Sequence, residues 1–176
     1  VLSSPIEEVD EEEWHTLEKG LLEAVENLND FRSTEGEVLQ QDFIARIALI
    51  KEYSEALVAF EEPRLELLRT RFRKSLESLV EEASFDNNRF EQELIYYIEK
   101  LDVTEEKVRL ARHLDYFIET INETGSNGKK LNFIAQEIGR EVNTIGSKAN
   151  SADIQKLVVM MKDELEKIKE QLSNIL

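Results

Sequence analysis

The stretch GKKLNFIAQEIGREVNTIGSKAN, residues 128–150, decides the fold of this chain. Apolar residues recur in it every three or four positions, which is the spacing of one face of an α-helix. The face that we expect to be buried holds Leu131, Ile134, Ile138, Val142 and Ile145. We therefore predict a helix over about 130–147 that packs into a core.

The opposite side of this predicted helix carries a second regular stripe. Its members are Gln136, Arg140, Asn143 and Ser147. Asparagine and serine are poor helix formers, so their presence on a merely solvated face is unexpected. The stripe indicates a polar contact surface, although a solvated face that contacts nothing fits the same pattern. Lys129 and Lys130 precede it at the helix N-terminus, where the helix dipole favours anions.

The other long segments also have the helical pattern, and no strand pattern or repeat is convincing. Ser4, with Pro5 and Glu7 after it, predicts the first helix start. We predict kinks near Gly36 and Pro63, because both residue types weaken a helix. Loops rich in Asn, Gly or Ser are predicted at 84–88 and 124–130. The predicted fold class is all-α, with elongated, antiparallel long helices and coiled-coil-like seams, which also predict self-association.

The charge is distributed unevenly along the chain. Of a formal net charge of −16 over 176 residues, residues 1–31 contribute ten acidic groups against one basic residue, Lys19. We predict long helical arms over 1–83, with an acidic segment over 1–31, and a C-terminal helical domain over 84–176. The acidic balance argues against this chain holding a long polyphosphate alone, since nucleic-acid binding relies on neutralising phosphates.

The residue content also bears on location. The chain has no cysteine, which excludes disulfides and thiolate metal sites and favours a cytoplasmic location. No apolar run approaches the roughly 20 residues of a membrane span, and no signal peptide is visible. The sequence begins at Val1 without a methionine, from which we expect a fragment of a longer protein.

A second stretch, LDVTEEKVRLARH at residues 101–113, is the main candidate for chemistry. On a helix, one stripe at the flank of the apolar face would hold Asp102, Glu106, Arg109 and His113. Carboxylates and an imidazole suit a divalent ion whose remaining ligands come from another helix or subunit. Glu91 or Glu93, on the preceding predicted helix, would supply a further ligand.

A structural interpretation explains the same residues. Asp102 followed by Glu105 has the spacing of a capping box, in which two side chains satisfy amides at the helix start. Glu106 and Arg109 would then form an ordinary surface ion pair, and His113 a hydrogen-bonded surface group. The residues alone leave the structural and the metal-binding interpretations open.

A third feature is the basic patch RTRFRK at residues 69–74, with Arg64 before it. It fits either the solvated flank of a coiled coil or a phosphate-binding strip. The chain has no P-loop, no dinucleotide-binding fingerprint, no H-E-x-x-H motif and no convincing Ser-His-Asp arrangement.

Several of these stretches together resemble the YicC/YloC family of bacterial proteins, first described as stress-induced and regarded as endoribonucleases. The resemblance is carried by NNRFEQEL (87–94), DVTEEKVRLARH (102–113), GKKLNFIAQEIGREVNTIGSKAN (128–150) and LEKIKEQLSNI (165–175), with STEGEVL (33–39) before them. It implies the C-terminal helical part of a divalent-metal-dependent enzyme that cleaves RNA phosphodiesters. It also implies a homo-oligomer, hexameric in the full-length form, and a separate N-terminal domain that is missing from this sequence.

The residue patterns and the resemblance together predict roles for individual residues. The metal ligands, for Mn²⁺ or Mg²⁺, would be Glu93, Asp102, Glu106 and His113. The catalytic residues would be Glu106, Arg109 and His113. The RNA-binding residues would be Lys129, Lys130, Gln136, Arg140, Asn143 and Lys148. The alternative function is a non-catalytic oligomerisation or scaffold module of a stress-related protein, with the RNA chemistry in the missing domain.

The sequence departs from the family pattern at three positions. Asn132 stands where aspartate is usual, Gly139 where asparagine is usual, and Leu176 in place of a terminal glutamate. If the usual aspartate were a metal ligand, its replacement by Asn132 would weaken metal binding.

Overall fold

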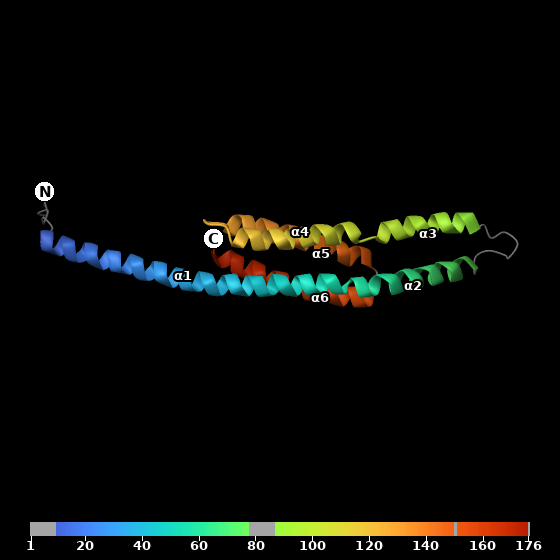
Figure 1. Ribbon diagram of the computed structural model, residues 1–176, viewed down its shortest axis with the longest axis horizontal. Helices are drawn as coiled ribbons and strands as arrows, with labels where there is room; N and C mark the ends of the chain where they lie inside the picture. Colours follow the sequence, from blue (N-terminus) through green and yellow to red (C-terminus); the bar gives the residue numbers. More distant parts are fainter. Residues whose placement is uncertain (1–9, 78–86, 150, 176) are drawn as a thin grey trace, which may run out of the picture. The chain divides into compact units, whose positions relative to one another are not determined.

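The computed structural model of the chain describes residues 10–77, 87–149 and 151–175. Within those ranges it contains no strand, and its helices (Figure 1) are α1 (Glu11–Ala56), α2 (Val58–Glu77), α3 (Asn87–Leu101), α4 (Thr104–Ile121), α5 (Gly128–Ala149) and α6 (Ala152–Ile175). The all-α prediction is confirmed. The predicted helix start at Ser4 and the first part of the predicted loop 84–88 lie outside the described residues.

The chain divides into two compact units, residues 1–41 and 42–176. The described part of the first unit is the beginning of α1, whose first turn holds Glu11, Glu12 and Glu13 near the positive end of the helix dipole. The apolar side chains at helical spacing in this unit are exposed: Trp14, Leu17, Leu21, Val25, Leu28 and Phe31. Among the described residues of the first unit, nothing packs on this apolar stripe.

The helices are not interrupted at the two positions where we predicted kinks, Gly36 and Pro63. α1 continues as helix through Gly36. The interruption nearest to Pro63 falls at Leu57, between α1 and α2, and Pro63 itself lies inside α2. There the amide of Leu57 donates to the carbonyl of Ser54 at 3.3 Å, and that of Phe60 to the carbonyl of Leu57 at 3.0 Å. Such i→i+3 bonds tighten the backbone locally.

In the second unit, α5 packs against both α4 and α6 (Figure 1). α4 and α5 run antiparallel, because Glu106 pairs with Lys148 whereas the carbonyl of Thr120 accepts a bond from Asn127. The predicted apolar face of α5 is buried throughout, since each of its members is at most 5% exposed: Leu131, Ile134, Ile138, Val142 and Ile145. This prediction is confirmed.

The last part of α1 completes the core of the second unit. The ring of Phe43 on α1 contacts the ring of Phe117 on α4 edge to face, with the ring centroids 5.9 Å apart. Ile47 of α1 is also buried. Arg46 ties α1 to α6 through an ion pair with Glu164 at 2.9 Å. Apolar residues continue at nearly heptad spacing beyond residue 60, but several of their side chains lie outside the described set: Leu65, Phe72, Leu76 and Leu79.

The third helix contacts both α2 and α5. Within α3, Leu94 is buried and Ile98 and Leu101 are partly buried, whereas Tyr97 is 38% exposed. None of the described helices is apolar over a stretch long enough to span a membrane.

Two glycines bring α5 and α6 close together. A Cβ atom at Gly146 would lie 3.0 Å from Cγ1 of Val158, and one at Gly139 would lie 3.2 Å from Cδ2 of Leu165. Val158 is buried, and a β-branched side chain in a helix has little rotamer freedom with which to yield. The absence of a side chain at Gly146 therefore sets the separation of the two helices.

We predict that Gly146→Ala lowers the free energy of unfolding in the wild type but raises it in a Val158→Ala background. In the wild type, overpacking of about 1–3 kcal/mol outweighs the gain of roughly 1 kcal/mol in helix propensity. In the Val158→Ala background the clash is removed, so only the gain remains. Urea unfolding of the wild type, the two single variants and the double variant, followed by circular dichroism, measures both effects. Equal effects in the two backgrounds would contradict the close approach.

Candidate functional site

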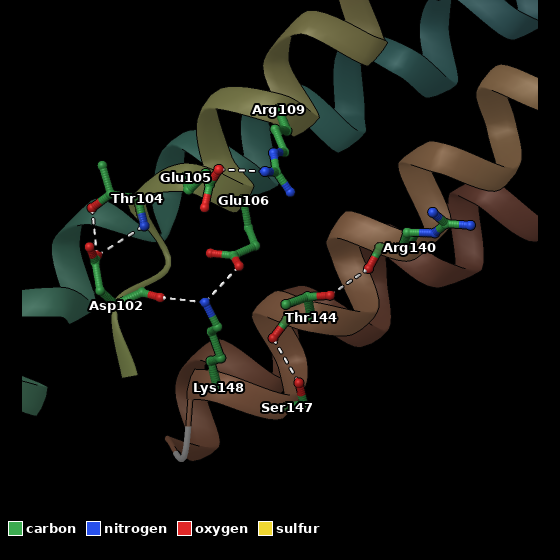
Figure 2. A network of polar contacts seen from close by, with 9 residues as sticks. All are labelled: Asp102, Thr104, Glu105, Glu106, Arg109, Arg140, Thr144, Ser147 and Lys148. Atoms are coloured by element: carbon green, nitrogen blue, oxygen red, sulfur yellow. Dashed lines mark hydrogen bonds and ion pairs between the residues drawn. The ribbon is translucent and has the colours of Figure 1, made fainter. Parts of the chain in front are cut away.

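Asp102 lies in the short connection between α3 and α4. Its Oδ1 atom accepts two hydrogen bonds from Thr104 (Figure 2), one from the hydroxyl at 2.6 Å and one from the backbone amide at 3.0 Å. These two bonds, the hydroxyl first, hold the pKa of Asp102 below its ordinary value, and the charge of Lys148 adds to them. Asp102 therefore satisfies an amide at the start of α4 that has no partner within the helix.

The predicted capping box is wrong in its second half. The residue that precedes α4 is Val103, which makes no side-chain capping bond. Glu105 does not reach back to the chain before the helix but pairs with Arg109, one turn further along (Figure 2). Both side chains are more than half exposed, so this ion pair contributes little to stability.

Glu106 is the buried acid of this region, with 5% of the residue exposed. Its Oε1 atom lies 2.6 Å from Nζ of Lys148, and the same ammonium donates to the carbonyl oxygen of Asp102 at 3.1 Å (Figure 2). Oε2 accepts no hydrogen bond from the described residues. Burial of a carboxylate is costly unless it is paired. Lys148 therefore permits the burial of Glu106 and ties the end of α5 to the start of α4.

Glu106 and Arg109 of the predicted stripe on α4 do not pair with each other but with different partners. Glu106 turns towards Lys148 and Arg109 towards Glu105, so these two pairs replace the predicted surface pair of Glu106 with Arg109. His113 is half-buried. It follows Arg109 by four residues, which places the imidazole and the guanidinium on neighbouring positions of one helix face.

The residues predicted as metal ligands do not form a cluster in one copy of the chain. Across residues 10–77, 87–149 and 151–175, no three His, Asp or Glu side chains are placed to hold a metal ion. Glu93 is exposed on α3. The cation beside Glu106 is the ammonium of Lys148, at hydrogen-bonding distance. The donors that the described residues of one chain present therefore do not fit a divalent ion.

The start of α5 is held by contacts within the chain. Nδ2 of Asn127 donates to the carbonyls of Thr120 and Glu123 at 3.1 and 3.0 Å, which closes the loop before the helix. Nζ of Lys130 lies 2.9 and 2.8 Å from the two carboxylate oxygens of Glu123 and 4.9 Å from the ring centroid of Tyr116. Glu123 first, and Tyr116 second, raise the pKa of Lys130.

The outer face of α5 is polar and accessible. Four of the six predicted RNA-binding residues are exposed there: Lys129, Gln136, Arg140 and Asn143. The side chain of Arg140 is 71% exposed, with a nitrogen 3.4 Å from a carboxylate oxygen of Glu137, and it points away from Lys148 (Figure 2). The other two predicted residues, Lys130 and Lys148, are engaged in ion pairs within the chain.

Sequence reasoning missed two aromatic residues beside these groups. Tyr116 is 43% exposed and Phe133 is 62% exposed. Phe133 follows Lys129 by four residues and precedes Gln136 by three. This spacing places it on the same outer stripe of α5, and extending the stripe by one turn in the sequence would have found it.

The basic patch at residues 69–74 lines a groove between α2 and α3 with a volume of about 620 Å³. Its lining residues include Arg69, Arg73, Lys74 and Glu91. Arg69 pairs with Glu66 at 3.1 Å, and both side chains are more than half exposed. Two alternative predictions for this patch therefore stay open: it binds phosphate, or it is the solvated flank of a coiled coil.

Known proteins resemble this chain over most of its length. Residues 58–176 match the sequence model of a family described as "Endoribonuclease YicC-like, C-terminal". A Clostridioides difficile protein named "Probable endoribonuclease YicC" is 38% identical over 174 residues, which cover 97% of this chain and 59% of that protein. A Haemophilus influenzae protein of the same name is 31% identical over 172 residues, which cover 96% and 59%. The chain thus spans 59% of the length of these relatives.

We predict that Lys148→Met lowers the free energy of unfolding by about 1–3 kcal/mol, because it leaves Glu106 buried without a cation. Glu106→Leu combined with Lys148→Met recovers most of this loss, since no buried charge remains. Lys129→Met, at an exposed lysine of the same helix, changes the free energy by less than about 0.5 kcal/mol. Urea unfolding measures all three variants. A loss of similar size in Lys129→Met would argue against the buried ion pair.

We predict that Thr104→Val raises the pKa of Asp102 towards its ordinary value, because it removes the hydroxyl donor and keeps the amide. Since the folded-state pKa is the lower one, Asp102 contributes stability above its unfolded-state pKa of about 3.9 and loses it as the pH falls through the folded-state pKa. As the pH falls through that acid range, the free energy of unfolding of Thr104→Val therefore decreases less than that of the wild type. Carboxyl chemical shifts measured during a pH titration check the shift. Thr34→Val, at a hydroxyl that bonds a backbone carbonyl, is the control and leaves Asp102 unchanged.

Proposed function

Because this chain belongs to the family of YicC-like endoribonucleases, we propose that it takes part in the internal cleavage of RNA phosphodiester bonds. The match of residues 58–176 to the family and the names of two relatives support this function. The chain spans 59% of the length of those relatives, so the activity of the whole protein is part of the proposal.

The observation that carries the proposal is the exposed cationic and amide-bearing face of α5. Lys129 and Arg140 would contact phosphates, and Gln136 and Asn143 would donate or accept hydrogen bonds. The acidic side chains nearest to this stripe in sequence are withdrawn from solvent, since that of Glu137 is 20% exposed and Glu141 is 5% exposed. A phosphate would therefore meet cations on this face although the whole chain carries a net charge of −16.

The chemistry of RNA cleavage requires proton transfer and stabilisation of developing negative charge. His113 is our candidate for the proton transfer, since imidazole is the side chain that enzymes use most often for it. Arg109, four residues before it, or Arg140 on α5 would stabilise the charge on the phosphorus-bound oxygens. Glu106 stays a candidate for a catalytic role, but its carboxylate would first have to leave Lys148.

A requirement for Mn²⁺ or Mg²⁺ stays a prediction that rests on the family resemblance. Because the donors of one described chain do not fit such an ion, a complete site would need ligands from another copy or from residues outside those described. Assembly as a homo-oligomer, and the cytoplasm as the site of action, also stay predictions. We assign no step of the reaction to a metal ion.

The alternative function is a non-catalytic helical scaffold. The exposed apolar side chains at helical spacing in the first unit favour it, because such a stripe is typical of a surface that packs against another helix. The ten acidic residues among residues 1–31 also favour it, since they would repel RNA from that segment.

We predict that the complete gene product carrying this chain cleaves RNA internally and that His113→Ala slows cleavage by about 100-fold or more, the usual contribution of general acid–base catalysis. His15→Ala is the matched control, because the chain has two histidines and the side chain of His15 is 80% exposed in the first unit. Gel electrophoresis of end-labelled RNA measures the rate, with Mn²⁺ and with EDTA in parallel.

Circular dichroism and sedimentation verify that both histidine variants keep the fold and the assembly of the wild type. Equal rates for His113→Ala and the wild type would remove His113 from the mechanism. A wild type that leaves RNA intact in Mn²⁺ would favour the scaffold function instead.

A further inference from the structure

We propose that the groove between α2 and α3 binds the terminal phosphate of a ribonucleotide, either free or at the end of an RNA chain. The groove is formed by other helices than α4, which carries His113, and α5 with its polar outer face. The inference therefore goes beyond the proposed function and does not depend on RNA cleavage by this chain.

The groove concentrates positive charge in an acidic protein. Its described lining includes three cations of α2, Arg69, Arg73 and Lys74, and two carboxylates, Glu66 and Glu91. Three positive charges against two negative ones leave a net charge of +1, whereas the whole chain carries −16. This balance attracts an anion and disfavours a divalent cation at Glu91.

Helical spacing brings the three cations to the same side of α2. At about 100° per residue, Arg73 lies roughly 40° and Lys74 roughly 140° from Arg69 around the helix axis. Arg71 lies roughly 200° from Arg69. It is exposed on the same helix but is not among the residues that line the groove. Two guanidinium groups and one ammonium group therefore border one space, and a fourth cation of the patch does not.

A terminal phosphate matches these donors better than a phosphate inside an RNA chain. It carries a charge of about −1.5 to −2 at pH 7 and three acceptor oxygens. A phosphate inside the chain carries a single negative charge and has fewer unesterified oxygens. Guanidinium groups bind phosphate oxygens through paired hydrogen bonds, and an ammonium group adds a point charge.

The remaining walls of the groove suit the nucleoside that carries the phosphate. The volume of about 620 Å³ lies in the range of small-molecule pockets. Glu91 is exposed on α3, and a carboxylate accepts hydrogen bonds from ribose hydroxyl groups. Leu94 follows Glu91 by three residues, so both lie on one face of α3. The side chain of Leu94 is buried and gives the groove an apolar wall.

The ion pair that is already present in the groove is a weak competitor. A guanidinium nitrogen of Arg69 lies 3.1 Å from a carboxylate oxygen of Glu66, and both side chains are more than half exposed. Exposed pairs of this kind contribute little to stability, so a phosphate can replace the carboxylate as the acceptor. The hydroxyl of Thr70 donates to the carbonyl of Glu66 at 2.9 Å, which leaves the cations as donors for the ligand.

The test measures binding to the complete gene product by isothermal titration calorimetry. The probes are adenosine 5′-monophosphate, adenosine 3′-monophosphate and adenosine. We expect a monophosphate to bind more tightly than adenosine by roughly tenfold or more, since adenosine lacks the acceptor for charge-assisted hydrogen bonds. Short RNAs of one sequence, with a phosphate at the 5′ end, at the 3′ end or at neither end, are compared in parallel.

Three substitutions on α2 distinguish the groove from the general charge of the helix. Arg73→Gln should weaken binding of the monophosphate by roughly 10- to 100-fold, because charge-assisted hydrogen bonds are lost. Arg73→Lys keeps the charge but not the planar fork, so its affinity should lie between those of the wild type and Arg73→Gln. Arg71→Gln is the matched control, which removes the same charge outside the groove and changes the affinity by no more than about twofold, because salt screens exposed charges. Circular dichroism verifies that the variants keep their helices.

Three results would overturn the phosphate site. They are equal affinity for the monophosphates and adenosine, equal losses in Arg71→Gln and Arg73→Gln, and no preference of the protein for any phosphorylated probe. Preference for a phosphorylated RNA end without binding of the monophosphates would identify RNA ends as the source of the phosphate. Binding of a monophosphate without a preference among RNA ends would identify free nucleotides as the source.

RNA cleavage by the same proteins separates this site from the proposed function. A wild type that binds a monophosphate through Arg73 but leaves RNA intact would support the groove and contradict only the cleavage function. A wild type that cleaves RNA but prefers no phosphorylated probe would contradict only the groove.

Discussion

The second unit depends on the burial of one face of α5 between α4 and α6. The five apolar side chains of that face are nearly inaccessible to water, and burial of such side chains is the main favourable term in folding. This packing also fixes the rotation of α5 about its own axis. A rotation by one residue, about 100°, would bring Arg140 or Gln136 towards the core, where an unpaired polar group is costly. The core therefore determines which side chains α5 presents to solvent.

The periodicity of the sequence predicted this arrangement well because it records burial directly. Every residue of the predicted inner face of α5 is buried, and the predicted outer residues Gln136, Arg140 and Asn143 are exposed. In the first unit the same kind of pattern is present, but the stripe that starts at Trp14 is exposed among the described residues. Periodicity shows that one face of a helix is apolar. It does not show what covers that face.

Contacts between helices could not be predicted in this way, since the spacing of residues identifies neighbours on one helix only. The sequence grouped Glu106 with Arg109 and His113 because the three share a stripe. In the structure the partner of Glu106 is Lys148, 42 positions away, and its position depends on how α4 packs on α5. The capping box failed for a local reason, because Glu105 has a cation within reach at Arg109.

Lys148 also bears on any metal requirement. An ammonium and a divalent ion at Oε1 of Glu106 would compete for one oxygen and repel each other, whereas Oε2 accepts no hydrogen bond from the described residues. To admit an ion at Oε1, Lys148 would have to release both Glu106 and the carbonyl of Asp102, which together hold the end of α5 against the start of α4. A metal ion bound elsewhere would leave this tie intact. A requirement for Mn²⁺ in RNA cleavage would therefore not by itself make Glu106 a ligand. Ligation through Oε1 would also need α5 to loosen from α4 when the ion binds.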